Sequence, residues 1–211
     1  MKTVAVLDYG MSNLHSVNRA LEYIAPKDWQ VIVSDQAQVF HDADKVVFPG
    51  QGASGKCMDL LRETGLDEAV REAIQHKPFL GICLGLQTLL TQSEENNGTP
   101  CLDLVQGTVK RFNAPLHDAS GERLKIPHMG WSPVQQTQAH PLWQGIEDNS
   151  RFYFVHSYYA APEDESKIAG MTEYPEAYTS AVAFDNVFAV QFHPEKSQHA
   201  GLQLLTNFLK W

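Results

Sequence analysis

The stretch Phe79-Leu80-Gly81-Ile82-Cys83-Leu84-Gly85 decides how this sequence folds and where its chemistry lies. Its first four residues are typical of a buried strand, and a helix is expected from about Leu84 to Thr91. The turn between them reads G-x-C-x-G, the thiol counterpart of the G-x-S-x-G nucleophile elbow, in which a sharp strand-to-helix turn exposes the central side chain. The stretch therefore predicts an α/β fold with Cys83 at the end of a strand.

Strand and helix patterns alternate on both sides of this unit in the first half of the chain. Apolar strands are expected at residues 4–7, 31–33, 46–48 and 79–82. A helix is expected from Ser12, a plausible N-cap, and a second over roughly 58–75 with a break near Gly65. Strands that are apolar on both faces and separated by helices indicate a parallel sheet covered on both sides, with the chemistry at its carboxyl edge.

The second half has a different pattern. Closely spaced strand signals at residues 105–112, 152–159, 177–184 and 187–192 predict antiparallel additions to the same sheet. A last helix over 198–210 is expected to bury Leu202, Leu205 and Leu209. The predicted fold is a mostly parallel central sheet flanked by helices, with antiparallel strands in the C-terminal half, and residues 1–211 are expected to form one domain.

Composition narrows the classes of protein to which the chain can belong. Its 16 basic and 25 acidic residues give a net charge of −9, and this argues against a nucleic-acid surface, which needs clustered Lys and Arg. No apolar run approaches the length of a membrane span, so we expect a cytoplasmic protein without membrane contact. The cysteines at 57, 83 and 101 show no metal-binding spacing, which indicates reduced thiols and predicts no metal and no cofactor.

Cys83 has the surroundings that a nucleophilic thiol needs. The glycines beside it permit the sharp turn, and the start of the following helix favours the thiolate, which lowers the cysteine pKa. The Leu84 N–H would then point to where an oxyanion forms. Taken alone, Cys83 is equally explained as a buried structural cysteine, the role that we assign to Cys57 and Cys101.

The segment Gln191-Phe192-His193-Pro194-Glu195 offers a base for this thiol. It follows an apolar strand, and Pro194 favours extended backbone at His193. Side chains two apart on an extended backbone share a face, so Glu195 is expected to bond one imidazole nitrogen while the other faces the thiol. A lone triplet of this kind is more simply a solvated turn, and it is the elbow cysteine that favours catalysis.

The glycine-rich loop from Gly50 to Cys57 has two readings. It nearly matches the phosphate-binding pattern G-x-x-x-x-G-K-[ST], but Cys57 stands where a Ser or Thr should hold magnesium. We favour a loop that presents bare backbone N–H groups beside the cysteine, with Gly52 as the second oxyanion donor. The nucleotide-binding alternative stays open.

Together these motifs resemble the class I, triad-type glutamine amidotransferases, and within them the glutamine amidotransferase subunits of imidazole glycerol phosphate synthases. The resemblance covers essentially the whole chain. Besides the elbow and Gln87 one turn later, its motifs are Asp8-Tyr9-Gly10, Asn13-Leu14, Pro49-Gly50, Pro127-His128-Met129-Gly130-Trp131, Val155-His156-Ser157-Tyr158 and His193-Pro194-Glu195-Lys196-Ser197.

The resemblance implies a function that the residues alone do not show. Members of this family hydrolyse L-glutamine and pass ammonia to a (β/α)8-barrel cyclase, with which they form a heterodimer. The cyclase makes imidazole glycerol phosphate and aminoimidazole carboxamide ribotide in histidine biosynthesis. Cys83 would be the nucleophile, His193 the general base and then acid, and Glu195 the group that orients it.

The resemblance also assigns residues around the substrate and the partner. Those expected around bound glutamine or its oxyanion are Gly50, Gly52, Leu84, Gln87, Ser157 and Tyr158. Lys196 would face the cyclase. Gln51 and Ala53 depart from a uniform family pattern, which leaves open which amide of the loop donates. The isolated chain would be a poor glutaminase, and a peptide flip among the loop glycines is the expected switch.

Three other readings stay open at this point. The nearest is the glutaminase of another ammonia-channelling synthase, such as the one that serves pyridoxal phosphate synthesis. The second is the nucleotide-binding module, and the third is a catalytically silent binding protein on the same fold. The third is disfavoured because all three triad residue types are present. Without the family resemblance, Gln87 and Lys196 would be read as solvated surface residues, and the 156–158 segment as one more strand whose alternate residues fill the core.

Overall fold

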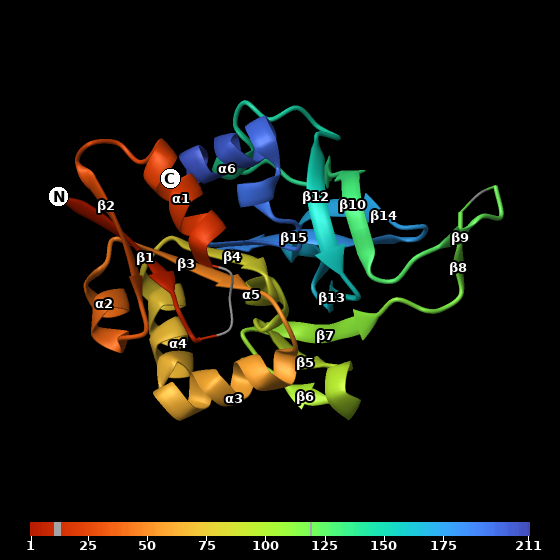
Figure 1. Cartoon of the computed structure of the whole chain (residues 1–211), viewed down its shortest axis with the longest axis horizontal. Helices are drawn as coiled ribbons and strands as arrows, with labels where there is room; N and C mark the ends of the chain where they lie inside the picture. Colours follow the sequence, from red (N-terminus) through yellow and green to blue (C-terminus); the bar gives the residue numbers. More distant parts are fainter. Residues whose placement is uncertain (11–13, 119) are drawn as a thin grey trace.

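The computed structural model describes residues 1–10, 14–118 and 120–211, and one 12-stranded sheet dominates this part of the chain (Figure 1). β14 (Ile168–Glu173) pairs with β15 (Ala177–Phe184), and β11 (Gln135–Gln136) pairs with β14. The other strands, in the order in which they lie side by side, are β2 (Trp29–Ser34), β1 (Lys2–Leu7), β3 (Lys45–Gly50), β4 (Phe79–Cys83), β16 (Val187–Val190), β15 (Ala177–Phe184), β13 (Tyr158–Pro162), β7 (Val105–Arg111), β5 (Leu90–Ser93) and β6 (Thr99–Pro100).

The five strands from β2 to β16 run parallel, which confirms the predicted parallel sheet. The 187–192 segment is antiparallel to β15 (Ala177–Phe184), as predicted, but its other neighbour β4 is parallel to it, which was not predicted. β16 returns from β15 by a tight antiparallel turn and therefore runs in the same direction as β4. Its four residues Val187–Val190 are all buried, as expected for a strand in the middle of a covered parallel sheet.

The other additions are antiparallel as predicted, with β13 beside both β7 and β15. The 152–159 segment is the exception, because it is not one strand. It divides at Ser157 into β13 and β12 (Arg151–His156), and β12 pairs with β10 (His128–Pro133) in a separate two-stranded sheet. A small hairpin of β8 (Leu116–His117) and β9 (Arg123–Leu124) projects from the molecule (Figure 1).

Helices cover both faces of the parallel strands. α1 (Leu14–Ile24) and α6 (Gln198–Lys210) lie on one face, and α2 (Ala37–Asp42), α3 (Ser54–Thr64) and α4 (Leu66–His76) lie on the other (Figure 1). Strand side chains alternate between these two layers, since Val4 and Val6 join the cluster with α1 and α6 while Ala5 and Leu7 join the other. Period-two alternation thus builds two cores from one strand.

Most predicted helices are present. Gly65, with φ +71°, separates α3 from α4 and confirms the predicted break. The expected N-cap Ser12 lies outside the described residues. In α6 the buried stripe is Leu204, Leu205, Phe208 and Leu209, while Leu202 is only half-buried, so the expected burial of Leu202 was wrong.

The helix after Cys83 is much shorter than predicted. α5 spans only Leu84–Gln87, and strand β5 begins at Leu90 where a helix to Thr91 was expected. The segment that follows explains the difference: backbone N–H groups of residues 101–105 bond the carbonyls of residues 88–91. These partners replace the intrahelical bonds that would have continued the helix.

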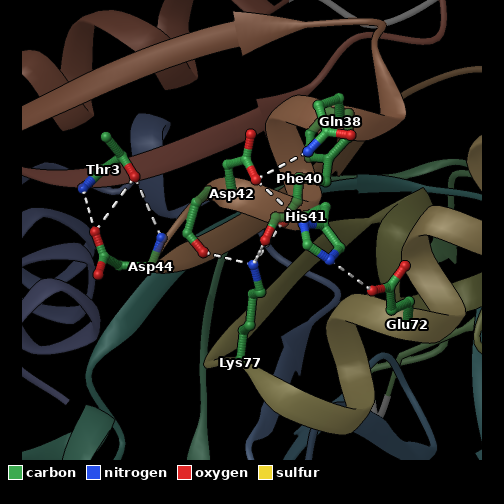
Figure 2. Close-up of polar contacts among 9 residues, drawn as sticks. Thr3, Gln38, Phe40, His41, Asp42, Asp44, Glu72 and Lys77 are labelled. Atoms are coloured by element: carbon green, nitrogen blue, oxygen red, sulfur yellow. Dashed lines mark hydrogen bonds and ion pairs between the residues drawn. The ribbon is translucent and has the colours of Figure 1, made fainter.

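Lysine and aspartate side chains lock the parallel strands to the helix layer (Figure 2). The Lys77 ammonium lies beside the end of α2 and donates to the carbonyls of Phe40 at 2.9 Å and Ala43 at 2.7 Å. Carbonyls at a helix end lack intrahelical partners, and a cation there is favourable. Asp44 accepts from the Thr3 backbone N–H at 2.6 Å. These contacts join α2 to β1 and to the start of β4, the strand that carries Cys83.

Candidate active site

Three neighbouring strands end together at the carboxyl edge of the parallel sheet. The last residues of β3 and β4, Gly50 and Cys83, are paired. Val190 of β16 pairs with Ile82 of β4, so Gln191 follows directly beside Cys83. The glycine loop, the elbow cysteine and the segment that leads to His193 therefore meet at one point, where the sequence predicted the chemistry.

The backbone at Cys83 forms a strained elbow, as predicted. Its φ of 53° and ψ of −103° lie outside the regions that a residue with a side chain prefers. Both neighbouring glycines are required by packing: a Cβ at Gly85 would lie 1.9 Å from the Phe48 carbonyl oxygen, and one at Gly81 would lie 2.8 Å from the Gly85 oxygen. The turn thus holds the thiol at the strand end.

His193 and Glu195 form a buried pair behind the elbow. The imidazole Nδ1 lies 2.8 Å from the Glu195 Oε1, and each side chain is only 2% exposed. α6 packs closely on this turn, because a Cβ at Gly201 would lie 1.9 Å from the Pro194 carbonyl oxygen. The Ser197 hydroxyl donates to the His193 carbonyl at 2.6 Å. The pair is therefore held by its own turn and by the helix behind it.

The surroundings of His193 favour its protonated form. Burial alone lowers its pKa, but the neighbouring Cys83 and Glu195 outweigh burial and raise the pKa to about 10. Glu195 occupies Nδ1, and Nε2 is buried without a hydrogen bond of normal geometry to any residue that the structure describes. An imidazole held in this way can exchange a proton through Nε2 with a nearby group.

The short α5 changes the expected electrostatics of the thiol. The predicted helix from about Leu84 to Thr91 would have had about two turns, and its start was expected to stabilise the thiolate. A helix of four residues sums few peptide dipoles, so its contribution is correspondingly small. Cys83 is the first of the neighbours that raise the pKa of His193.

A cavity of about 450 Å³ opens in front of Cys83. Seven of the predicted site residues line it, namely Gly52, Cys83, Leu84, Gln87, Ser157, Tyr158 and Lys196. His193, Glu195 and Gly50 instead line a separate small hollow with Ile82, the residue before Cys83. A larger cavity of about 830 Å³ lies under the β8–β9 hairpin and contains none of the predicted site residues. The predicted site residues thus gather around the carboxyl end of β4.

The cavity also has walls that the sequence analysis did not predict. These are Gln51, Glu95, Pro127, Tyr153, Val155 and His156. Tyr153 and Val155 alternate along β12 with Phe152 and Phe154, which are buried in the core. The alternation along β12 was visible in the sequence, but its partner strand β10 was not recognised.

Gln87 is held by two acceptors at the cavity wall. Its Nε2 donates to the Tyr158 carbonyl at 2.8 Å and to the Gln191 Oε1 at 3.1 Å. Gln191 in turn lies with its Nε2 3.5 Å from the Cys83 sulphur. No role was predicted for Gln191, although this residue lies two positions before His193 and hence on the same face of an extended chain.

A second group of buried rings lies beyond Tyr158. His156 contacts the Tyr158 carbonyl through Nδ1 at 2.8 Å and the Tyr178 hydroxyl through Nε2 at 3.2 Å. His128 contacts the same hydroxyl through Nδ1 at 3.1 Å. Burial lowers the pKa of His156 to about 3 and that of His128 to about 4. Both imidazoles are therefore neutral near pH 7, in contrast to His193.

The loop after β3 does not have the arrangement of a phosphate site. The first N–H of α3, from Ser54, donates to the Glu95 carboxylate at 2.7 Å, so an anionic side chain already occupies the helix start. Lys56 is exposed to solvent, while Cys57 is fully buried. Burial raises the pKa of Cys57 to about 12 and that of Cys101 to about 11, which keeps both thiols protonated.

Within residues 1–10, 14–118 and 120–211, no three His, Cys, Asp or Glu side chains gather closely enough to hold a metal ion. None of the helices in these ranges has both the length and the apolar character that a membrane crossing requires.

Comparison with known proteins gives the family. The family model Glutamine amidotransferase class-I matches residues 5–211. The imidazole glycerol phosphate synthase subunit HisH of Methylococcus capsulatus is 56% identical over 212 residues, which cover 100% of this chain and 97% of the relative. The corresponding subunit of Hydrogenovibrio crunogenus is 51% identical over 210 residues, with the same coverage.

A solved structure supports the fold independently. PurLQS from Thermotoga maritima has a TM-score of 0.70 at 18% sequence identity and covers 99% of this chain and 98% of its own. At that identity the likeness shows the fold alone. By the family match and the identity to its relatives, the chain belongs to the class-I glutamine amidotransferases and, within them, to the family of HisH subunits.

Proposed function

We propose that this chain, acting as one domain, hydrolyses L-glutamine to glutamate and ammonia through a thioester on Cys83. The observation that carries the proposal is the position of the elbow thiol, which lines a cavity of about 450 Å³ and neighbours His193, whose Nδ1 lies 2.8 Å from the Glu195 carboxylate. A nucleophile, a base and a group that orients the base are what covalent catalysis at an amide requires.

The first half of the reaction forms the thioester. The Cys83 thiolate attacks the side-chain amide carbon of glutamine, and the backbone N–H groups of Leu84 and Gly52 stabilise the oxyanion. His193, protonated and held by Glu195, gives its proton to the leaving nitrogen, which departs as ammonia. Gly50 supports this arrangement, because a Cβ there would lie 2.7 Å from the Leu84 Cβ, and only glycine lets the loop lie so close to the elbow.

The second half releases glutamate. Neutral His193 takes a proton from water, the resulting hydroxide attacks the thioester carbon, and the Cys83 thiolate leaves. One water is consumed for each glutamate and ammonia formed. Glu195 keeps the Nδ1 proton in place throughout, so that Nε2 is the nitrogen that accepts and donates.

The charges in the cavity suit a free amino acid. Glu95 and Lys196 are the carboxylate and the ammonium among its lining residues, and glutamine carries one charge of each sign on its α-carbon. We assign the substrate ammonium to Glu95, and the carboxylate to the Ser157–Tyr158 segment. Gln87 uses its Nε2 in two contacts with the protein, which leaves its Oε1 to accept a hydrogen bond from the substrate.

The ammonia is proposed to pass to a separate (β/α)8-barrel cyclase subunit in a heterodimer, which forms imidazole glycerol phosphate in histidine biosynthesis in the cytoplasm. The HisH relatives, named as imidazole glycerol phosphate synthase subunits, support this assignment over another ammonia-channelling synthase. Lys196 follows Glu195 directly and is half-buried at the cavity. It is the residue proposed to contact the partner, and its ammonium would form a charge pair with the partner when the two chains bind.

The nucleotide-binding alternative receives no support from the geometry. Glu95 already caps α3 with a carboxylate, and a phosphate in the same place would meet like charge.

The test is ammonia or glutamate release from glutamine by the chain alone, with a candidate cyclase, and with cyclase plus its nucleotide substrate. We expect low turnover alone and high turnover in the complete mixture. Absence of glutamine hydrolysis in all three mixtures would contradict the proposed function, and equal rates in all three would contradict only the coupling to a partner.

A further inference from the structure

One buried amide touches the nucleophile and has no part in the triad. Gln191 is 0% exposed, and its Nε2 lies 3.5 Å from the Cys83 sulphur. A buried side-chain amide can present either its oxygen, an acceptor, or its NH₂ group, a donor, to a neighbouring atom. The hydrogen-bond network around Gln191 decides which atom faces the sulphur.

The network begins at an atom that can only accept. The Tyr158 carbonyl oxygen lies 2.8 Å from the Gln87 amide, so Gln87 must present its NH₂ group there. The same NH₂ group lies 3.1 Å from the Gln191 amide, which must therefore present its oxygen. The Gln191 NH₂ group is then left facing the sulphur as a donor.

The same carbonyl fixes a second chain in the other direction. His156 lies 2.8 Å from it and must donate its Nδ1 proton, so its Nε2 accepts from the Tyr178 hydroxyl. Tyr178 then accepts from His128, whose Nε2 lies 2.9 Å from the Ser132 hydroxyl. Every donor in this chain has an acceptor, so the Tyr158 carbonyl is held firmly and the orientation of Gln87 is held with it.

We propose that Gln191 is a further catalytic residue, which donates a hydrogen bond to the Cys83 sulphur and stabilises its thiolate, with its orientation fixed by Gln87 and the Tyr158 carbonyl. The inference rests on the proposed function, in which that thiolate attacks glutamine. Hydrogen bonds to the charged form of a group favour that form. The four-residue α5 contributes little to the same end, so the amide supplies what the short helix does not.

The experiment measures the thiolate without using turnover. The rate of iodoacetamide alkylation of the full chain is followed against pH, and the Cys83→Ala variant gives the background from Cys57 and Cys101. Gln191→Met keeps the size of the side chain and removes the donor. We expect its alkylation midpoint to lie about one pH unit higher, which is an about tenfold slower reaction below the midpoint.

Two further variants distinguish loss of the hydrogen bond between Gln191 and Cys83 from a non-specific change in the packing around the thiol. Gln191→Glu keeps the shape but places a negative charge beside the sulphur, and we expect the midpoint to rise in this variant as well. Tyr178→Phe removes only the link between His156 and His128 and leaves the Tyr158 carbonyl bound by both Gln87 and His156, so the midpoint should stay within about 0.3 pH unit. Circular dichroism and the thermal midpoint establish that each variant is folded.

An unchanged midpoint in either folded Gln191 variant would overturn the inference, and so would an equal rise in Tyr178→Phe. These outcomes leave the proposed function intact, because that function is tested separately by the loss of glutamine hydrolysis in Cys83→Ala. Conversely, full hydrolysis by Cys83→Ala would contradict the proposed function while the alkylation midpoints still report on the hydrogen bond.

Discussion

Two buried histidines near Cys83, His193 and His156, differ in charge state. His193 is 2% exposed and its pKa is raised to about 10, whereas His156 is 6% exposed and its pKa is lowered to about 3. Burial lowers the pKa of both rings. The neighbours decide the outcome: a thiol and a carboxylate surround His193, while a carbonyl and a hydroxyl contact His156.

The difference separates proton transfer from positioning. A histidine beside groups that become anionic can hold and release a proton, and His193 does so at the reacting atoms. A histidine between neutral partners keeps one tautomer and acts as a fixed hydrogen-bonding link, and His156 does so through the Tyr158 carbonyl. Depth of burial therefore does not identify the catalytic histidine, whereas the charge of its partners does.

The largest expected effect comes from removing the thiol beside His193. In Cys83→Ala we expect glutamine hydrolysis to fall by more than about 10⁴-fold, because no neighbouring group can form the thioester. Cys83 is the first of the neighbours that raise the pKa of His193, so this pKa should also fall in the variant. Ammonia release and NMR titration of the imidazole measure these two effects.

A matched control for this variant is Cys57→Ala, which removes a buried thiol elsewhere in the core and should retain hydrolysis. The Cys83→Ala chain with its cyclase should still make product from added ammonium salt. Normal glutamine turnover by Cys83→Ala would end the thioester mechanism.

The second test asks whether His193 and Glu195 act as one unit. We expect His193→Asn to lower the rate by about 10²–10⁴-fold and Glu195→Gln to lower it less, because the carboxylate acts through the imidazole at 2.8 Å. The double variant should resemble His193→Asn alone, since effects within one unit do not add. Strictly additive losses in kcat/KM would show two independent roles.

The His193 side of this comparison was readable from the sequence because its signals are local. The elbow glycines, Cys83, and the His193–Glu195 spacing each lie within a few residues, and the period-two rule correctly placed the carboxylate beside the imidazole. The parallel sheet followed from apolar strands separated by helices. The same rule, applied to Gln191, would have placed that amide on the His193 face.

The His156 side was not readable because it depends on pairing between distant segments. Gln191 lies 104 residues from Gln87 and 50 residues separate Tyr178 from His128. These contacts need the register of β10 on β12 and the parallel direction of β16, and both were missed. The predicted length of the helix after Cys83 was wrong for a related reason, since residues 101–105 bond the carbonyls of residues 88–91, where that helix would have continued.

A third, smaller effect tests the neutral state of His156 through stability. Its folded pKa of about 3 lies below the value near 6.5 for an unfolded chain. Between these values the unfolded state binds more protons, so stability is complete above about pH 6.5 and is lost as the pH falls. In His156→Gln, the unfolding free energy should fall less steeply between pH 6.5 and 5, by about 1 kcal/mol per pH unit.

Urea unfolding at several pH values measures that slope, and the comparison at pH 8 isolates lost packing and hydrogen bonds from protonation. His193 has the opposite sign: its raised pKa gives stability that is present below about pH 6.5 and is lost as the pH rises through about 10. An identical acid slope in wild type and His156→Gln would mean that His156 is protonated in the folded protein, and the contrast with His193 would disappear.

The smallest expected effect is at Lys56, a positive charge that belongs to neither histidine's surroundings. It is exposed on α3, while the start of that helix already binds the Glu95 carboxylate at 2.7 Å. Lys56→Ala should therefore change glutamine turnover by less than about twofold, since an exposed charge with no close partner contributes little. The wild-type chain should bind no ATP in the presence of magnesium. Tight ATP binding that is lost in Lys56→Ala would instead make the loop a phosphate site.

Glu95→Gln sharpens the test, because it weakens the cap on α3 without touching Lys56. It should impair glutamine binding and should not create ATP binding, because the carboxylate belongs to the amino-acid cavity and does not merely mask a nucleotide site.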